Sequence, residues 1–94
     1  MQISGFSDHA LVRMQQRGIP PVVLECLLAY GRAEYDHNGG RIVFFDKTAR
    51  RKLGRARVER ISVDIEKHIN AYAVVACDGT VTTVGHRYRR IPRN

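Results

Sequence analysis

The stretch from Ala71 to Ile91, AYAVVACDGTVTTVGHRYRRI, decides the fold of this chain. Two runs rich in β-branched and apolar residues flank Asp78-Gly79, and an Asp-Gly step is typical of the two-residue turn of a β-hairpin. The second arm ends in a polar segment that places His86 among arginines. We therefore expect a C-terminal antiparallel hairpin with a titratable imidazole beside fixed positive charge.

Side chains alternate between the two faces of each strand of this hairpin. His86 and Tyr88 then share one face with Thr82 and Val84, and Arg87 lies on the other. A register shift of one residue would exchange the two sets, so the sequence does not decide which set is buried.

Two helices are expected before this hairpin, at the N-terminal end. Ser7 is a suitable N-cap for a helix over residues 8–17, which the following glycine should end. A second helix, mostly apolar and expected to be the most buried element, begins at Pro20-Pro21 and ends at Gly31. The short link between them predicts an αα-hairpin.

A further β-hairpin and a short helix are expected in the middle of the chain. Residues 32–36 and 41–46 fit two antiparallel strands, because a glycine-containing turn separates them. A helix should follow over residues 48–53 and end at Gly54. The element order predicts a single α+β domain over residues 1–94.

Residues 58–69 fit both a helical and a strand period, and we expect a short helical segment over residues 63–68. His68 would end that segment, and His37 would lie in the turn before the second strand. We expect neither histidine to have a chemical role.

Positive charge is the main compositional signal. The 94 residues contain sixteen lysines and arginines, mostly arginines, against nine acidic residues, a formal net charge of +7. Arginine suits phosphate contacts and stacking on bases, so the composition favours RNA or another nucleic acid as partner. A solvated surface of an arginine-rich protein is the alternative. The densest basic run, residues 47–60, contains Arg50 and Arg51 and allows the same two interpretations.

Three residues of the first helix form a basic row. His9, Arg13 and Arg17 are spaced by four, which places them along one side of the helix. An anionic partner would relieve the repulsion between like charges at this spacing. A solvated helix flank with an ordinary surface histidine is equally consistent.

No pattern indicates a metal, a cofactor, a disulfide or a membrane span. Cys26 and Cys77 lie far apart in apolar segments, without the Cys/His spacing of a zinc site, and we expect two buried, reduced thiols. No apolar run is long enough to cross a membrane. The N-terminus lacks the features of a secretory signal, so we expect a cytoplasmic protein.

A set of residues at each end of the chain forms a recognisable pattern. Its members are Ser7-Asp8-His9-Ala10, Arg13-Met14, Arg17-Gly18-Ile19, Tyr72-Ala73-Val74-Val75, Asp78-Gly79-Thr80-Val81, Thr83-Val84 and Arg87. The pattern covers nearly the whole chain and resembles domain-of-unknown-function family 4258. That family has been grouped with the barnase–EndoU–colicin–RelE superfamily, which includes ribonuclease domains and RelE/ParE-like toxins.

The resemblance implies a fold, an activity and partners. The fold would be α+β, with the two N-terminal helices packed on one face of a four-stranded antiparallel sheet and a short extra helix between the two hairpins. The activity would be metal-independent cleavage of RNA by a toxin, and a partner would be an acidic antitoxin protein. The family's polar positions correspond to His9, Arg13 and Arg17, and to His86 and Arg87.

Cleaving RNA without a metal requires a base for the 2′-OH, positive charge for the phosphorane and an acid for the leaving oxygen. Histidine is the natural acid or base near neutrality, whereas arginine supplies only charge and donors. His86 is the first candidate for the catalytic imidazole and His9 the second, and Tyr88 is a candidate for base stacking or proton donation. The expected phosphate-binding residues are Arg13, Arg17, Arg41, Arg87, Arg50, Arg51 and Arg90.

Three functions stay open from the sequence. A ribonuclease would bring His9 and His86 together with at least two arginines in one cleft. A nucleic-acid-binding or ribosome-binding module without catalysis would present a flat basic face. A module that docks an acidic antitoxin would show an exposed apolar groove beside the basic run.

Overall fold

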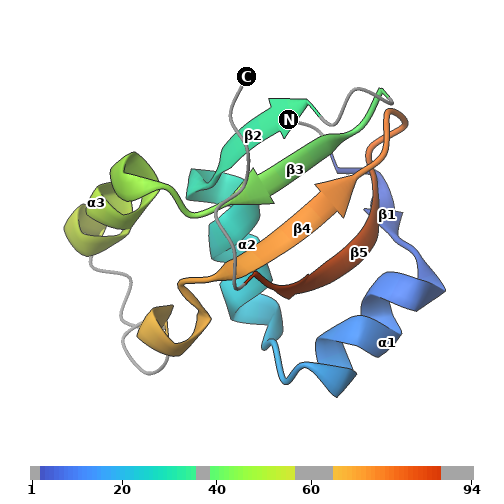
Figure 1. Cartoon of the computed structure of the whole chain (residues 1–94), viewed down its shortest axis with the longest axis horizontal. Coiled ribbons are helices and arrows are strands. Elements are labelled where there is room, and N and C mark those ends of the chain that lie inside the picture. The colour runs from blue at the N-terminus through green and yellow to red at the C-terminus, as the bar shows by residue number, and fades with distance from the viewer. Residues whose placement is uncertain (1–2, 36–38, 57–64, 88–94) are drawn as a thin grey trace.

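The computed structural model describes residues 3–35, 39–56 and 65–87, without the side chains of residues 53–56 and 65–66. Helices, strands and one 3-10 helix alternate along the chain (Figure 1). They are β1 (Gly5–Phe6), α1 (Asp8–Gln16), α2 (Pro21–Tyr30), β2 (Arg32–Tyr35), β3 (Arg41–Phe44), α3 (Lys47–Ala56), the 3-10 helix η2 (Ile65–His68), β4 (Ala71–Val75) and β5 (Thr80–His86).

The described residues form one mixed sheet with the strand order β1-β5-β4-β3-β2. Strands β2 to β5 are antiparallel to their neighbours, but β1 pairs in parallel with β5, so the sheet has five strands where four antiparallel strands were expected. Strand β1 has only two residues and no alternating pattern. Its backbone is held by β5 instead, because Ser4 N donates to Gly79 O at 2.9 Å and Ser7 N to Val81 O at 2.9 Å.

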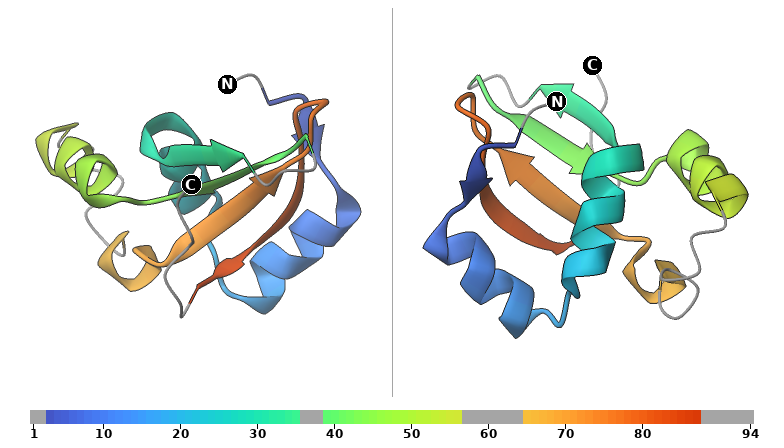
Figure 2. Two further views of the ribbon diagram at one scale, coloured as in Figure 1. Left: turned by 45° about the horizontal axis from the view of Figure 1, so that its top comes forward. Right: turned by 180° about the vertical axis from the view of Figure 1, so that it is seen from behind.

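Helices α1 and α2 cover one face of the sheet, as the view from behind in Figure 2 shows. Helix α1 lies along β5, and α2 crosses β3 and β4. The core between these layers is formed by Ala10 of α1, by α2 and by the inward residues of β3, β4 and β5. Its most buried members include Leu24, Leu27, Val43, Val81 and Val84.

A β-bulge settles the register of the final hairpin. Val74 pairs with Thr83 and Val75 pairs with Val81, so Thr82 is the extra residue on β5. The bulge keeps Val81 and Val84 on the same buried face despite their odd spacing. His86 follows Val84 by two residues and therefore lies on the helix-covered side of the sheet.

The turn of this hairpin is longer than the predicted two-residue turn. Gly79 N donates to Ala76 O at 2.9 Å and Ala76 N to Thr80 O at 2.8 Å. Gly79 has a φ of +89°, the left-handed conformation that ends a three-residue hairpin loop. Cys77 lies in this loop and is exposed. The expectation of two buried thiols is therefore wrong for Cys77 and right for Cys26.

Strand β3 and helix α3 differ from their predicted lengths for two reasons. Asp46 was assigned to the strand, but its carboxylate accepts a hydrogen bond from Ala49 N at 2.7 Å and caps α3. The strand therefore ends at Phe44. Helix α3 also continues to Ala56, past the predicted stop at Gly54, because a glycine inside a helix costs only about 1 kcal/mol.

The remaining predicted segments agree where they are described. The helical segment expected over residues 63–68 is the 3-10 helix η2, with residues 63 and 64 outside the described part. His37 also lies outside it. In the described ranges, no helix has the length and apolarity needed to cross a membrane.

Candidate functional site

Two imidazoles meet where β5 and η2 end. His86 Nε2 lies 3.0 Å from His68 Nδ1, which is hydrogen-bond distance. The rings are stacked, with centroids 5.2 Å apart and an interplanar angle of 22°. A ring nitrogen donates only when it carries a proton, so one ring donates and the other accepts.

The backbone around β4 brings these two histidines together. His86 pairs with Ala71 at the end of the β4–β5 ladder. Arg87 N then donates to Asn70 O at 2.8 Å, which extends the pairing by one step. His68 precedes this junction as the last residue of η2, so its ring lies against the end of β5. Sequence reasoning missed His68 as a site residue, because no motif spacing links it to His86.

The surroundings of His86 favour its neutral form. Burial, then His68, then the positive charge of Arg17 lower the pKa of His86 from its ordinary value. Arg17 is the C-cap residue of α1, whose axis runs beside β5. A neutral imidazole at neutral pH is suited to accept a proton, so His86 has the protonation state of a general base.

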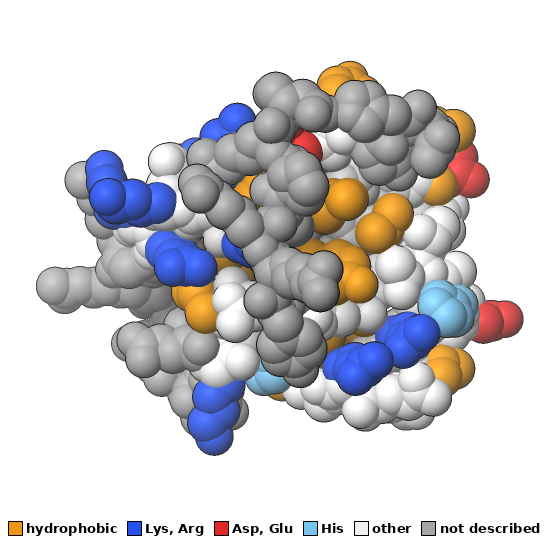
Figure 3. Space-filling view, viewed as in Figure 1, with side chains coloured by type: hydrophobic (Ala, Val, Ile, Leu, Met, Phe, Trp, Pro, Cys, Tyr) orange, Lys and Arg blue, Asp and Glu red, His pale blue; other side chains and the backbone are white. Residues whose placement is uncertain are grey.

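His9 does not join this pair. It is exposed in the first turn of α1, whereas Arg17 lies eight residues later at the other end. At 1.5 Å per residue, this separation is about 12 Å along the helix axis. Arg13 lies between them and is half-buried. Figure 3 shows two separate histidine patches with basic side chains between them.

Arg87 lies away from the histidine pair, on the other face of the sheet. Its guanidinium carbon is 5.0 Å from the centroid of the Phe44 ring, and Nη2 donates to Phe45 O at 3.5 Å. Neighbouring residues on a strand point to opposite faces. The same alternation that places His86 beside η2 therefore directs Arg87 over Phe44.

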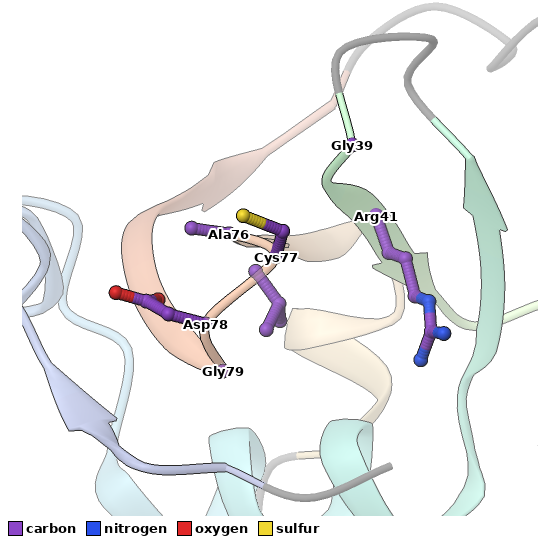
Figure 4. Close-up of a pocket in the computed structure, with 7 residues that line it drawn as sticks. Gly39, Arg41, Ala76, Cys77, Asp78 and Gly79 are labelled. Carbon is purple, nitrogen blue, oxygen red and sulfur yellow. The ribbon is translucent and has the colours of Figure 1, made fainter.

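Arg41 lies at the opposite end of the sheet. It pairs with Val75, four residues along β4 from the Ala71–His86 pair, and its guanidinium carbon is 5.3 Å from the centroid of the exposed Tyr35 ring. It lines a pocket of about 280 Å³ between β3 and the final hairpin loop (Figure 4). The lining residues are Gly39, Arg41, Val75, Ala76, Cys77, Asp78 and Gly79.

The other predicted phosphate-binding residues lie elsewhere. Arg50 and Arg51 are exposed on α3, beside exposed Lys47 and Lys52. Helix α3 packs against α2 and projects from the side of the sheet away from α1 (Figure 1). Tyr88 and Arg90 lie outside the described residues. Of the predicted site residues, His86 thus contacts His68, which was not predicted, and the positive charge of Arg17 acts on His86.

A group of three or more possible metal ligands is absent from the described residues. No family model, no curated protein and no solved structure matches the chain. The resemblance to domain-of-unknown-function family 4258 therefore stays an expectation.

Proposed function

We propose that this protein is a metal-independent endoribonuclease and that the contact between His68 and His86, beside Arg17, is its catalytic centre. The single observation that carries the proposal is the 3.0 Å approach of the two imidazole nitrogens of His68 and His86. Transfer of an RNA phosphoryl group requires an acid and a base that are both within reach of the reacting phosphate.

The environment of His86 suits it to the role of the base. Burial, then His68, then Arg17 lower the pKa of His86 and so oppose a positive charge on it. His68, the other imidazole of the pair, would then be the acid. His86 would remove the proton of the 2′-OH, whose oxygen attacks the adjacent phosphorus. His68 would donate its proton to the 5′-oxygen as the phosphorus–oxygen bond breaks. The products would be a 2′,3′-cyclic phosphate and a free 5′-hydroxyl.

Arg13 and Arg17 of α1 supply the phosphate contacts. Arg17 would stabilise the charge that develops on the phosphorane, because it is the cation that acts on His86. Arg13 lies one helical turn earlier, at a spacing of about 5–6 Å that suits a neighbouring phosphate. The RNA strand would then follow α1 towards the histidine pair.

The test is incubation of the purified protein with a mixed-sequence RNA in excess EDTA, beside DNA of the same sequence. We expect cleavage of RNA with 2′,3′-cyclic phosphate ends, and intact DNA, because DNA lacks the 2′-OH. Cleavage of both substrates, or RNA products with 5′-phosphates, would contradict the mechanism. Intact RNA would contradict the activity itself.

A second candidate function, docking of an acidic protein, is favoured by the outer face of α1. Leu11 and Val12 are each 49 % exposed and the neighbouring Phe6 is 40 % exposed. Phe6 and Leu11 occupy the two positions of a hydrophobic staple around the Ser7 N-cap, but Val12 has no such role. Because exposed Arg17 lies on the same helix and the net charge is +7, a partner with apolar anchors and carboxylates would fit best.

A labelled, glutamate-rich amphipathic helical peptide distinguishes this candidate from the first. If α1 is a docking face, the peptide binds in a salt-dependent way, Val12→Asp weakens binding, and Gln16→Asp on the same helix weakens it less. Equal losses of peptide affinity in both variants would mean that the peptide responds only to the charge of the helix and not to Val12. Absence of binding would remove the candidate.

A further inference from the structure

The histidine pair is closed in this structure. At 3.0 Å, the two facing nitrogens are already at hydrogen-bond distance from each other. A phosphate oxygen placed between them would need about 2.8 Å to each nitrogen, which moves the nitrogens to roughly 5 Å apart. A substrate phosphate therefore has to displace the bond between the imidazoles.

We propose that the hydrogen bond between His68 and His86 is a proton-linked gate for a tetrahedral oxyanion, which parts the two rings, binds between them and Arg17, and drives uptake of a proton by the pair. This inference rests on the proposed function in placing the anion at the same site. It adds that the pair is closed in the free protein and that pH controls entry of the anion to the site.

The contact between His68 and His86 limits how many protons the two facing nitrogens can carry. In the closed pair, one nitrogen must lack a proton in order to accept the hydrogen bond. Protonation of both rings would set two N–H groups against each other at 3.0 Å. When an anion lies between the rings, both can donate to it. The closed pair therefore disfavours protonation of both rings, whereas a bound anion favours it.

The charged groups around the pair favour an anion. Among the described residues, His68 of η2 and Arg17 of α1 are the charged or titratable groups that shift the pKa of His86, and both are basic. On the strand side, His86 pairs with Ala71, which carries no charge. An oxyanion would gain charge-assisted hydrogen bonds from this set.

The two sides of the gate are held differently. His86 is fixed in β5 by its pairing with Ala71 and by the following bond from Arg87 N to Asn70 O at 2.8 Å. His68 lies outside the sheet, at the end of a four-residue 3-10 helix. Hydrogen-bond geometry in 3-10 helices is poorer than in α-helices, so η2 holds His68 less firmly than the sheet holds His86. Opening therefore moves His68 away from a stationary His86.

The affinity for the anion should fall as pH rises. Anion binding raises the pKa of the pair above its value in the free protein, so affinity is highest at low pH and falls as pH rises through the raised pKa. Each proton taken up changes the dissociation constant by at most about tenfold per pH unit. Ordinary surface attraction to lysine and arginine gives no such dependence between pH 6 and 8.

Inorganic sulfate is the probe, because it is a tetrahedral dianion that does not titrate in this range. The imidazole C2–H resonances are followed by NMR during sulfate titrations at constant ionic strength, at about pH 6 and about pH 8. We expect the dissociation constant to be about tenfold lower or more at the lower pH, with both His68 and His86 titrating at higher pH when sulfate is present. Equal affinities, or unmoved midpoints, would overturn the gate.

A matched pair of variants locates the effect. His68→Gln removes one side of the gate, whereas His9→Gln makes the same change at the far end of α1. The pH dependence should disappear in His68→Gln and persist in His9→Gln, and its persistence in both would overturn the inference. The wild-type titration gives an answer even if His68→Gln does not fold.

RNA cleavage measured on the same protein preparations without sulfate separates the two proposals. Sulfate binding with the expected pH dependence but no cleavage would support the gate and remove the ribonuclease. Cleavage without pH-linked sulfate binding would support the ribonuclease and overturn the gate.

Discussion

Gly31 tests the packing that positions the sheet beneath α2. It ends α2, and its N–H donates to Leu27 O at 2.7 Å. A Cβ at this position would collide with that carbonyl oxygen, lie 2.8 Å from Val43 Cγ1 and lie 3.1 Å from Phe44 O. Two of the three neighbours are backbone atoms, which cannot rotate away. Gly31→Ala therefore has to distort the last turn of α2 and to move that turn away from β3.

The expected cost is large for a single methyl group. Overpacking of a well-packed core costs about 1–3 kcal/mol, and the backbone clash places Gly31→Ala at the upper end, about 3 kcal/mol. For a domain of this size, each kcal/mol lowers Tm by about 4–8 °C, so we expect a fall of roughly 12–24 °C. Thermal unfolding followed by circular dichroism measures it.

Gly5→Ala is the matched control, because a Cβ on Gly5 meets no atom within 4 Å. Its Tm should stay within about 4 °C of wild type. A Gly31→Ala protein that also melts within about 4 °C of wild type would refute the close approach of α2 to β3.

Three further outcomes are expected. Ser7→Ala should lower the free energy of unfolding by about 1–2 kcal/mol in urea titrations, because the Ser7 hydroxyl both caps α1 and donates to a carbonyl of β5; no change would remove both roles. Since the pKa of His86 is lowered on folding, its contribution to stability is present above the unfolded value of about 6.5 and is lost as pH falls below that value. His86→Gln should therefore flatten the plot of unfolding free energy against pH below about 6.5, and an unchanged plot would contradict the lowered pKa of His86. A thiol reagent should label exposed Cys77 in the native protein and buried Cys26 only after unfolding, and equal labelling would contradict the fold.

Helix caps, helix starts and strand alternation in the sequence predicted α1, α2, β4 and β5. The Ser7 cap and the Pro20-Pro21 start gave α1 and α2, which the structure places within one residue of their predicted bounds. The alternating apolar residues gave β4 and β5. In each case the deciding contacts lie within a few residues of one another, so the pattern is visible along the chain.

What the sequence did not predict depends on residues far apart. Strand β1 exists because β5 offers it backbone partners, and two residues carry no period of their own. The bulge at Thr82 is set by pairing with β4 rather than by its own sequence. Such features follow from tertiary contacts that no local pattern shows.

The candidate site was predicted in part for the same reason. Arg17 and His86 were named from the basic row and the strand end, and α1 packing along β5 brings them together. A ribonuclease site was expected to combine His9 with His86, but the length of α1 separates His9 from the end of the helix that carries Arg17. His68 was predicted to be a helix-end histidine without a chemical role. Its contact with His86, 18 residues away, depends on the turn before β4, which no local pattern shows.

The most direct measurement is the rate of RNA cleavage in EDTA by wild type, His68→Gln and His9→Gln, with folding of each variant checked by its Tm. Loss of a catalytic acid costs about 10²–10⁴-fold, so we predict a fall of that size for His68→Gln and a change of less than about threefold for His9→Gln. A folded His68→Gln protein that cleaves RNA as fast as wild type, or an equal loss in both variants, would contradict a catalytic role for the His68–His86 pair.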